Sequence, residues 1–220
     1  VWITRAEMDR MAQADAGIVL NHLSNLKLKS GIAPVKDMRE SGVRLALGCD
    51  NCSGSDVQNM NQAMKLFCLF NAVSDPEPGP ELAHEAIRMA TLGGARSAGL
   101  QNRVGAIKPG MAADIVLYDL DDIAYLPFNN AARQVVYSET ARGVQTVIVD
   151  GNVVIRDRTL TSVDEQALRE EVQGLIRTFI ADYDAIRAER EKAMPYMLEM
   201  QRKVWSHDLP MMRFLERTLE

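Results

Sequence analysis

The first part of the chain contains two short apolar runs, and the segment between them has the pattern of a helix. Residues 16–20 and 43–47 are rich in Ala, Val, Leu and Ile, which is typical of buried strands. Between them, residues 35–41 predict a helix that ends where Gly42 supplies a stop signal. The order strand, helix, strand predicts a parallel α/β unit with functional loops after each strand.

Polar residues mark where further helices of this part begin. Thr4 and Glu7 form the Thr-x-x-Glu pattern of a capping box, so we expect a helix to begin after Thr4. We also expect Asp56 to cap a helix of residues 56–73. Residues 21–34 are rich in Asn, Ser, Lys and Gly and predict a loop.

The pattern changes near residue 100. Helical spacing over residues 81–89 and 94–99 gives way to short runs rich in β-branched residues. These runs are residues 114–118, 134–137, 145–149 and 152–155. Asp150-Gly151 lies between the last two runs and is a strong signal for a type I′ hairpin. We therefore expect a small, partly antiparallel β module.

A charged amphipathic segment follows from residue 163 and predicts helix, interrupted near Pro195 and Pro210. Residues 189–192 alternate in charge, which is typical of a solvated helix face. The apolar residues of this segment indicate packing or an interface rather than a cofactor site. They are Met197, Met200, Val204, Met211, Met212 and Phe214.

Composition narrows the class of protein. The 220 residues are 47% apolar and 25% charged, which is typical of a globular protein with one large or two small domains. The net charge of −5 lacks the basic footprint of a nucleic-acid-binding protein. No apolar stretch approaches the roughly 18 residues of a membrane span, and no secretory leader is recognisable. We expect neither nucleic acid nor membrane as a partner.

The cysteines indicate a reducing compartment. Cys49, Cys52 and Cys68 cannot all pair with one another, which favours a reduced, cytoplasmic setting. Cys49 and Cys52 have the spacing of a zinc or redox pair. The chain has no second such pair and only three histidines, which argues against a structural zinc site.

Asp50 directly follows the second apolar run, in the segment Gly48-Cys49-Asp50-Asn51. In an α/β barrel, the carboxyl ends of the strands carry the chemistry. A carboxylate at that position can ligate a metal ion with one oxygen and accept a proton from water with the other. The alternative is that Asp50 only caps the following turn or helix.

Five segments carry recognisable motifs in a fixed order. They are residues 24–34, SNLKLKSGIAP; 47–50, LGCD; 90–96, ATLGGAR; 105–116, GAIKPGMAADIV; and 144–151, VQTVIVDG. Together they resemble the C-terminal part of enzymes of the metal-dependent amidohydrolase superfamily, in its deaminase and chlorohydrolase (cytosine deaminase-like) branch. The resemblance extends from the first residue to about residue 155.

The resemblance implies an α/β fold. Expected are the C-terminal part of a (β/α)8 TIM-like barrel, part of a small accessory β-sandwich and a helical C-terminal tail. These parts would be residues 1–100, 101–160 and 161–220. Two strands cannot close a barrel. We therefore expect one unpaired edge in each sheet, with Ile18, Leu45 and Leu47 exposed unless another chain covers them.

The resemblance also implies roles for individual residues. Asp50 matches the superfamily's metal ligand and proton-transfer carboxylate. The superfamily's histidine ligands have no counterpart, because the histidines here are isolated at His22, His84 and His207. We expect the remaining ligands upstream of Val1.

The loop after the first strand departs from the superfamily pattern His-Asn-Pro-x-Ser-Asn. Aligning on Ser24 places Leu20 at the histidine and His22 at the proline. His22 either restores an imidazole contact to substrate or packs within the loop. Asn51 and Ser53 either bind substrate or cap the next helix.

The activity that the resemblance implies is metal-dependent hydrolysis of a non-peptide carbon–nitrogen bond in a small heterocycle, namely hydrolytic deamination. It implies one divalent ion, zinc or alternatively iron, in a cytoplasmic homo-oligomer that includes the N-terminal part of the barrel. Two alternatives stay open: hydrolytic dehalogenation of an aromatic heterocycle, and a non-catalytic role in assembly.

Overall fold

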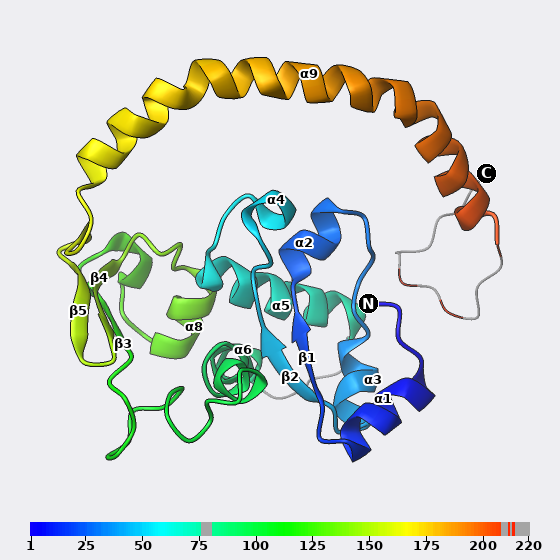
Figure 1. Cartoon of the computed structure of the whole chain (residues 1–220). Coiled ribbons are helices and arrows are strands. Elements are labelled where there is room, and N and C mark those ends of the chain that lie inside the picture. The colour runs from blue at the N-terminus through cyan, green and yellow to red at the C-terminus, as the bar shows by residue number, and fades with distance from the viewer. Residues whose placement is uncertain (76–80, 208–210, 212, 214–220) are drawn as a thin grey trace. The chain divides into compact units, whose positions relative to one another are not determined.

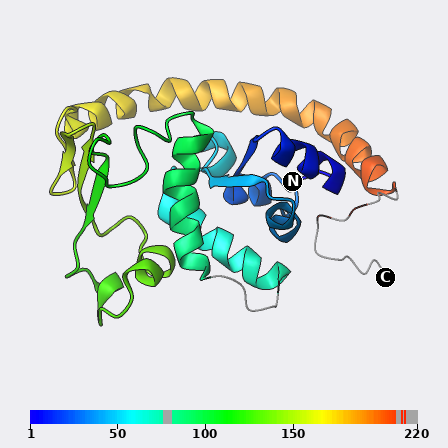
Figure 2. The same cartoon turned by 90° about the horizontal axis from the view of Figure 1, so that it is seen from below.

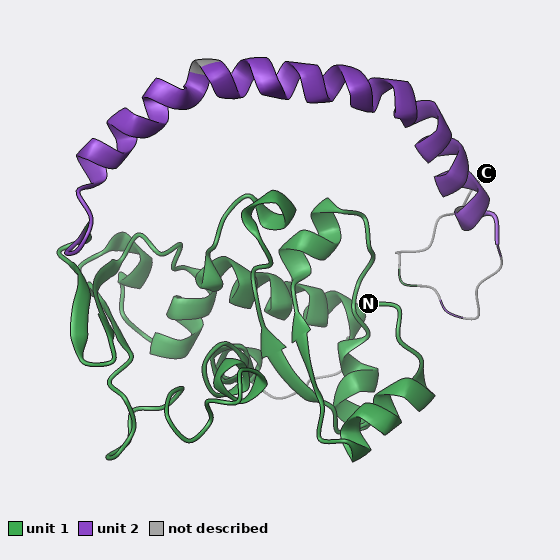
Figure 3. Cartoon of the chain, viewed as in Figure 1, with its two compact units in different colours: residues 1–159, 213–220 green, residues 160–212 purple. Residues whose placement is uncertain are grey.

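The computed structural model describes residues 1–75, 81–207, 211 and 213 (Figure 1). The chain divides into two units (Figure 3). One unit comprises Val1–Thr159 with Arg213–Glu220, and the other comprises Leu160–Met212.

Two parallel strands form the sheet of the first unit. Strand β1 (Gly17–Leu20) pairs with β2 (Arg44–Leu47), so that Ile18 lies beside Leu45 and Leu20 beside Leu47. Helix α3 (Val35–Glu40) connects them. The predicted parallel strand–helix–strand unit is therefore confirmed. Among the described residues, each of these strands has one pairing partner.

Helix α1 (Arg5–Gln13) begins at the predicted capping box. Glu7 N–H donates to the Thr4 hydroxyl, and the Glu7 carboxylate accepts from Thr4 N–H at 2.8 Å. The expected loop over residues 21–34 is wrong in part, because α2 (His22–Lys27) follows β1 directly. Asn21 precedes its first turn and is of a type common at that position, but its side chain makes no capping hydrogen bond.

The helix expected after the second strand starts later than predicted. Asp56 does not begin it: this residue ends the short helix α4 (Cys52–Ser55) in a left-handed conformation, with φ of 63°. Asn59 instead caps α5 (Met60–Ser74), accepting from Gln62 N–H at 3.0 Å.

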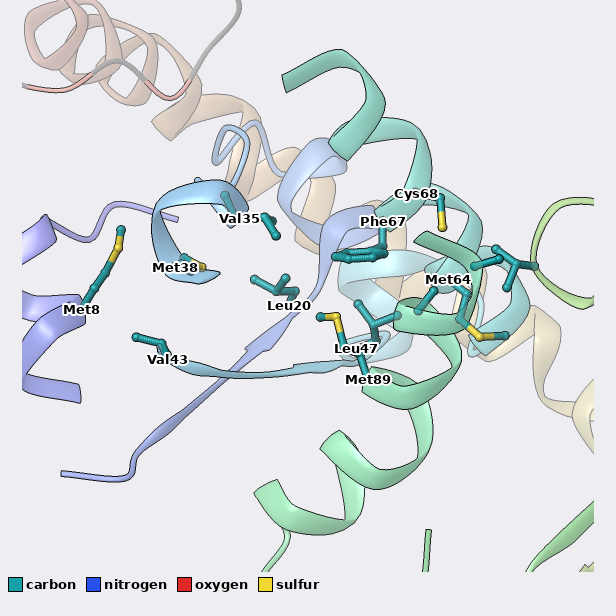
Figure 4. Packing of buried hydrophobic residues seen from close by; sticks show 14 residues of the cluster. Met8, Leu20, Val35, Met38, Val43, Leu47, Met64, Phe67, Cys68 and Met89 are labelled. Carbon is teal, nitrogen blue, oxygen red and sulfur yellow. The ribbon is translucent and has the colours of Figure 1, made fainter. Parts of the chain in front are cut away.

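The core packs the sheet against helices that include α1, α3 and α5 (Figure 4). Phe67 of α5 is fully buried and packs with Leu20 and Leu47 in one cluster of buried residues. The expected exposure of Leu47 is wrong, since it is only 4% exposed. Ile18 and Leu45 are half-buried, and the exposed apolar side chain of this sheet is Val19.

The two helices expected over 81–89 and 94–99 form one continuous helix, which Figure 2 shows lengthwise. It consists of α6 (Leu82–Arg88), a π-helical turn η1 (Met89–Gly93) and α7 (Gly94–Ser97). At Gly93 an added Cβ would lie 2.6 Å from the carbonyl oxygen of Leu45, so η1 approaches the backbone of β2 closely.

The second sheet has four strands in the order β3-β4-β5-β6. Their bounds are Ile115–Tyr118, Val144–Val149, Asn152–Arg156 and Thr159–Leu160. The predicted hairpin at Asp150-Gly151 is confirmed. Strands β4 and β5 pair antiparallel, and both turn residues have positive φ, as a type I′ turn requires.

The β-branched run at residues 134–137 is not a strand. It is the end of α8 (Ala131–Tyr137), which Asn130 caps by accepting from Arg133 N–H at 2.9 Å. Val136 is fully buried in the core of the first unit, so packing outweighs strand propensity there. The short 3₁₀ turn η2 (Ile123–Tyr125) precedes this helix.

Among its described residues, the second unit contains one helix, α9 (Glu165–Trp205), of 41 residues. Asp164 caps it by accepting from two backbone N–H groups. The interruption expected at Pro195 is wrong, because this proline lies inside the helix; Pro210 lies outside the described residues. In the part of the chain that the structure describes, no helix has both the length and the apolar character of a membrane span.

Candidate active site

The carboxyl ends of β1 and β2 bring together two polar segments that are distant in sequence. Gly48 N–H donates to the Leu20 carbonyl oxygen at 3.0 Å, so the two strands remain paired up to the point where the loops begin. A Cβ at Gly48 would lie 2.5 Å from Asn21 Oδ1 and 3.0 Å from Val19 Cγ1. The absence of a side chain at Gly48 therefore permits the close approach of the two loops.

Asp50 lies at this edge, in the loop after β2, with a φ of 64°. Its Oδ2 accepts a hydrogen bond of 2.5 Å from the hydroxyl of Ser24, which belongs to α2. Its Oδ1 accepts from the backbone N–H of Asn51 at 2.7 Å. Each carboxylate oxygen is thus oriented by one donor.

These hydrogen bonds set the charge of the carboxylate. Donation by Ser24, and then by the backbone of Asn51, lowers the pKa of Asp50 below its ordinary value. The side chain is exposed, and at neutral pH it is ionised. Asp50 therefore offers an oriented, charged oxygen that can ligate a cation or accept a proton.

Gly54 packs against this pair from the following helix. A Cβ there would lie 2.9 Å from Asp50 Oδ2 and 3.1 Å from Ser24 Oγ. Gln58 adds a hydrogen bond from its side-chain amide to the backbone carbonyl oxygen of Asp50. The Asp50 backbone and side chain are thus held by α2, α4 and the loop before α5.

Asn51 and Ser53 contact each other. Asn51 caps α4 by accepting from Gly54 N–H at 2.8 Å, and Ser53 Oγ donates to the same Asn51 oxygen at 2.7 Å. Ser55 is buried, and its hydroxyl donates to the carbonyl oxygens of Asn51 and Val57. The geometry supports the capping alternative for Asn51; contact of Asn51 or Ser53 with substrate stays a prediction.

His22 lies in the core and not at the open edge. Its ring stacks on Phe70 and meets Phe67 edge-on, with ring centroids 5.9 and 6.0 Å away. The residue is 4% exposed, and neither ring nitrogen has a hydrogen-bond partner among the described residues. Burial lowers the pKa of His22 to about 4, so the ring is neutral at pH 7. This geometry supports packing, the second of the two alternatives for His22.

Ser24 is a residue of the site that the sequence did not predict. The hydroxyl is buried, and its bond to Asp50 joins residues 26 positions apart in the chain. The available signal was the place of Ser24 in the motif after the first strand, because the carboxyl ends of adjacent parallel strands meet.

Asp50 is the one predicted metal ligand of this chain. Its ionised, exposed carboxylate suits a divalent cation, and the ring of His22 is turned into the core instead. Within the described ranges, no group of three or more His, Cys, Asp or Glu side chains is arranged to hold a metal ion. Cys49 and Cys52 are free thiols, and burial raises the pKa of Cys49.

A carboxylate at the carboxyl ends of adjacent parallel strands is placed as in the active sites of α/β barrels and of other parallel α/β folds. The sequence model of the amidohydrolase family matches residues 1–154. The chain therefore belongs to the amidohydrolase family.

Deaminases and a chlorohydrolase are among the proteins that this chain resembles. A 5-methylthioadenosine/S-adenosylhomocysteine deaminase of Desulforudis audaxviator is 36% identical over 180 residues, which are 82% of this chain and 42% of that protein. A zinc-bound adenosine deaminase structure from Xanthomonas campestris superposes with a TM-score of 0.78 at 28% identity, covering 82% of this chain and 41% of its own. The zinc complex of atrazine chlorohydrolase from Arthrobacter aurescens gives 0.73 at 25% identity, covering 80% and 39%. The chain thus spans about two fifths of the proteins it matches.

Proposed function

We propose that this chain forms part of a metal-dependent amidohydrolase that removes an amino group from a small heterocycle by hydrolysis. The family membership and the deaminases among its relatives support this activity. The observation that carries the proposal is the ionised carboxylate of Asp50, oriented by Ser24 at the carboxyl ends of β1 and β2.

In this proposal Asp50 is the proton acceptor. Water adds to the ring carbon that bears the amino group, a C–O bond forms, the C–N bond breaks, and ammonia leaves. Asp50 accepts the proton that the attacking water loses and passes it to the departing nitrogen. The hydrogen bonds from Ser24 and from Asn51 N–H keep both carboxylate oxygens in place during this transfer.

A divalent ion would be held in part by Asp50. Zinc fits the proposal, because two structurally similar enzymes contain it; iron is the alternative. When bound, such an ion lowers the pKa of water and so supplies the nucleophile at neutral pH. Zinc sites use three or four protein ligands, and we propose that the others come from barrel strands upstream of Val1.

The substrate in this proposal is an aminated heterocycle of the adenine type. The Desulforudis audaxviator relative is named for its action on 5-methylthioadenosine and S-adenosylhomocysteine, both of which carry adenine. We also propose that β3–β6 belong to an accessory β-sandwich, and that the enzyme is a cytoplasmic homo-oligomer. We further propose that Asn51 and Ser53, which are exposed and follow Asp50 in the chain, contact the substrate.

Replacing Asp50 with Asn tests the proposal in a protein that joins this chain to the remaining barrel strands. Asn preserves the size but removes the charge, so kcat for ammonia release should fall on the order of 10²-fold or more. Asp56→Asn is the matched control. Asp56 lies in the same loop region with a positive φ that Asn tolerates, and its bond to Lys27 is exposed. Turnover of Asp50→Asn close to that of the control, with metal supplied, would leave Asp50 only a structural role, as acceptor of the bonds from Ser24 and Asn51 N–H.

Hydrolytic dehalogenation is the second candidate, favoured by the structural similarity to atrazine chlorohydrolase. The two activities differ in the leaving group. A panel of aminated and chlorinated heterocycles, assayed for ammonia and for chloride, distinguishes them. If the enzyme releases chloride but no ammonia, dehalogenation replaces deamination as the proposed activity. If the metal-loaded enzyme releases neither, a role in assembly is favoured.

A further inference from the structure

Helix α9 carries a row of apolar side chains along one face. The family match ends at residue 154, and α9 begins at Glu165. Eight large apolar side chains of this face are between 46% and 62% exposed. They are Val172, Ile176, Phe179, Tyr183, Ile186, Met197, Met200 and Val204. We refer to these eight residues, together with Arg190 and Ala193, as the α9 seam.

The seam repeats with the spacing of a coiled coil. Its residues follow one another at alternating intervals of four and three, without a break from Val172 to Val204. Apolar residues spaced in this way occupy the a and d positions of heptads and remain on one side of a helix that supercoils with a partner. Phe179 and Tyr183 stack on each other at 6.1 Å between ring centroids, which shows that consecutive seam residues share a face.

Residues beside the seam favour a parallel partner of identical sequence. In a parallel pair of equal register, a residue at g faces the residue five positions later, at e, on the other helix. Asp182 would then face Arg187 of the second copy, Leu175 would face Ile180, and no g–e pair would join like charges. The two copies of Arg190, at an a position, would face each other across the seam. The present partner of Arg187 is Glu191 on its own helix, in an exposed pair that is easily exchanged.

The antiparallel arrangement is less favourable. Overlapping the whole seam in opposite directions places Arg187 opposite the second Arg187, and Glu189 opposite the second Glu189, at the centre of the pair. Like charges at e and g positions oppose pairing. In the parallel arrangement, by contrast, Glu189 of one helix lies beside Arg190 of the other. Its negative charge compensates the positive charge of Arg190 in the seam.

We propose that the α9 seam is a dimerisation surface, and that it pairs with the seam of a second copy of this chain as a parallel, in-register coiled coil. Arg190 and the Asp182–Arg187 pairs set the register, as single polar residues at a positions and e–g charge pairs do in coiled coils. The proposal concerns the assembly of the chain and stands apart from the deaminase chemistry.

Sedimentation equilibrium of the whole chain tests the surface. The parent chain should be a dimer, whereas Ile186→Lys, which places a charge in the middle of the seam, should be a monomer under the same conditions. Ala188→Lys is the matched control, since Ala188 is exposed on the same helix at an f position, opposite the seam, and should remain dimeric. A monomeric parent chain, or an Ile186→Lys variant that dimerises as the parent does, overturns the proposal.

A disulfide tests orientation and register. In the parallel pair the two copies of Ile186 face each other at a d position, so Ile186→Cys should form a crosslinked dimer on mild oxidation. In the antiparallel pair Ile186 would face Arg190 instead. The control is the parent chain, oxidised under the same conditions, which reveals any crosslinks that form through Cys49 and Cys52. Absence of a crosslink specific to Ile186→Cys in a dimeric sample would exclude the parallel register.

Discussion

Two adjacent glycines of one helix provide a sharp test of how η1 packs on the sheet. A Cβ at Gly93 would lie 2.6 Å from the Leu45 carbonyl oxygen and 3.3 Å from Ala46 Cα, whereas a Cβ at Gly94 has nothing within 4 Å. Both residues have helical backbone angles. We predict that Gly93→Ala destabilises the first unit and that Gly94→Ala stabilises it.

The magnitude follows from two opposing effects. Ala in place of Gly stabilises a helix by roughly 0.5–1 kcal/mol at either position. At Gly93 the added methyl group must push backbone atoms of β2 aside, and such overpacking costs about 1–3 kcal/mol. The gain in helix propensity is the same in both variants. The difference between their free energies of unfolding therefore measures the cost of overpacking at Gly93. It should be about 1–3 kcal/mol, or about 2–12 °C in Tm.

Hydrogen exchange is the suitable assay, because circular dichroism would add the signal of α9 to that of the first unit. The free energy of opening is read from backbone amides of β1 and β2, by mass spectrometry of peptides that contain them. Protection in Gly93→Ala should fall below that of the parent chain, and protection in Gly94→Ala should match or exceed it. Equal protection in the two variants would refute the close packing of η1 on β2.

Three further outcomes follow from the site and its surroundings. Ser24→Ala removes the main cause of the low pKa of Asp50, so an NMR titration should show that pKa rising toward its ordinary value; an unchanged pKa would contradict the assigned cause. In the parent chain, the stabilisation from this lowered pKa is present above the unfolded-state pKa of about 3.9 and is lost as pH falls through the folded value. His22 acts in a different window: its pKa is about 4 when folded and about 6.5 when unfolded, so the unfolded chain binds the proton first. Unfolding free energy should fall, on the order of 3 kcal/mol in total, as pH drops from about 6.5 to about 4. His22→Leu should lack this particular loss in urea titrations, and an identical pH dependence in both chains would argue against the buried neutral ring.

Local sequence signals were sufficient where neighbouring residues decide the structure. The capping box of Thr4 and Glu7 and the hairpin at Asp150-Gly151 rest on hydrogen bonds and backbone angles within a few residues, and both are confirmed. The apolar runs at residues 16–20 and 43–47 form the predicted parallel pair, because one strand face of each is buried against helices.

Three elements that the sequence predicted wrongly have different physical causes. The run at 134–137 has β-branched residues, yet Val136 is buried in the core as part of a helix that Asn130 caps. Asp56 and Asn59 are both of residue types that cap helices. Asn59 caps α5, whereas Asp56 has a positive φ and lies in a turn before it. Pro195 lacks an N–H group but lies inside α9 without ending it.

The same distinction holds within the candidate site. The sequence predicted Asp50 as a site residue because it follows a strand-like apolar run. Active-site residues of α/β barrels lie at the carboxyl ends of strands. Ser24 could not be assigned to Asp50 without the register of β1 and β2, which brings α2 to the loop after β2. The burial of His22 depends on Phe67 and Phe70 of α5, a helix far along the chain.

The environment of Asp50 places two demands on one carboxylate. Holding a cation requires an ionised group, which the hydrogen bonds from Ser24 and Asn51 secure by lowering the pKa. Accepting a proton is most efficient when the pKa lies near the working pH, so the same hydrogen bonds weaken Asp50 as a base. A cation on one carboxylate oxygen would lower the pKa of Asp50 further and make it a still weaker base. The proposed ion would offset this loss by lowering the pKa of the attacking water. Ser24→Ala separates the two demands in the assembled enzyme. If positioning dominates, kcat falls although Asp50 becomes the stronger base; if basicity dominates, kcat rises.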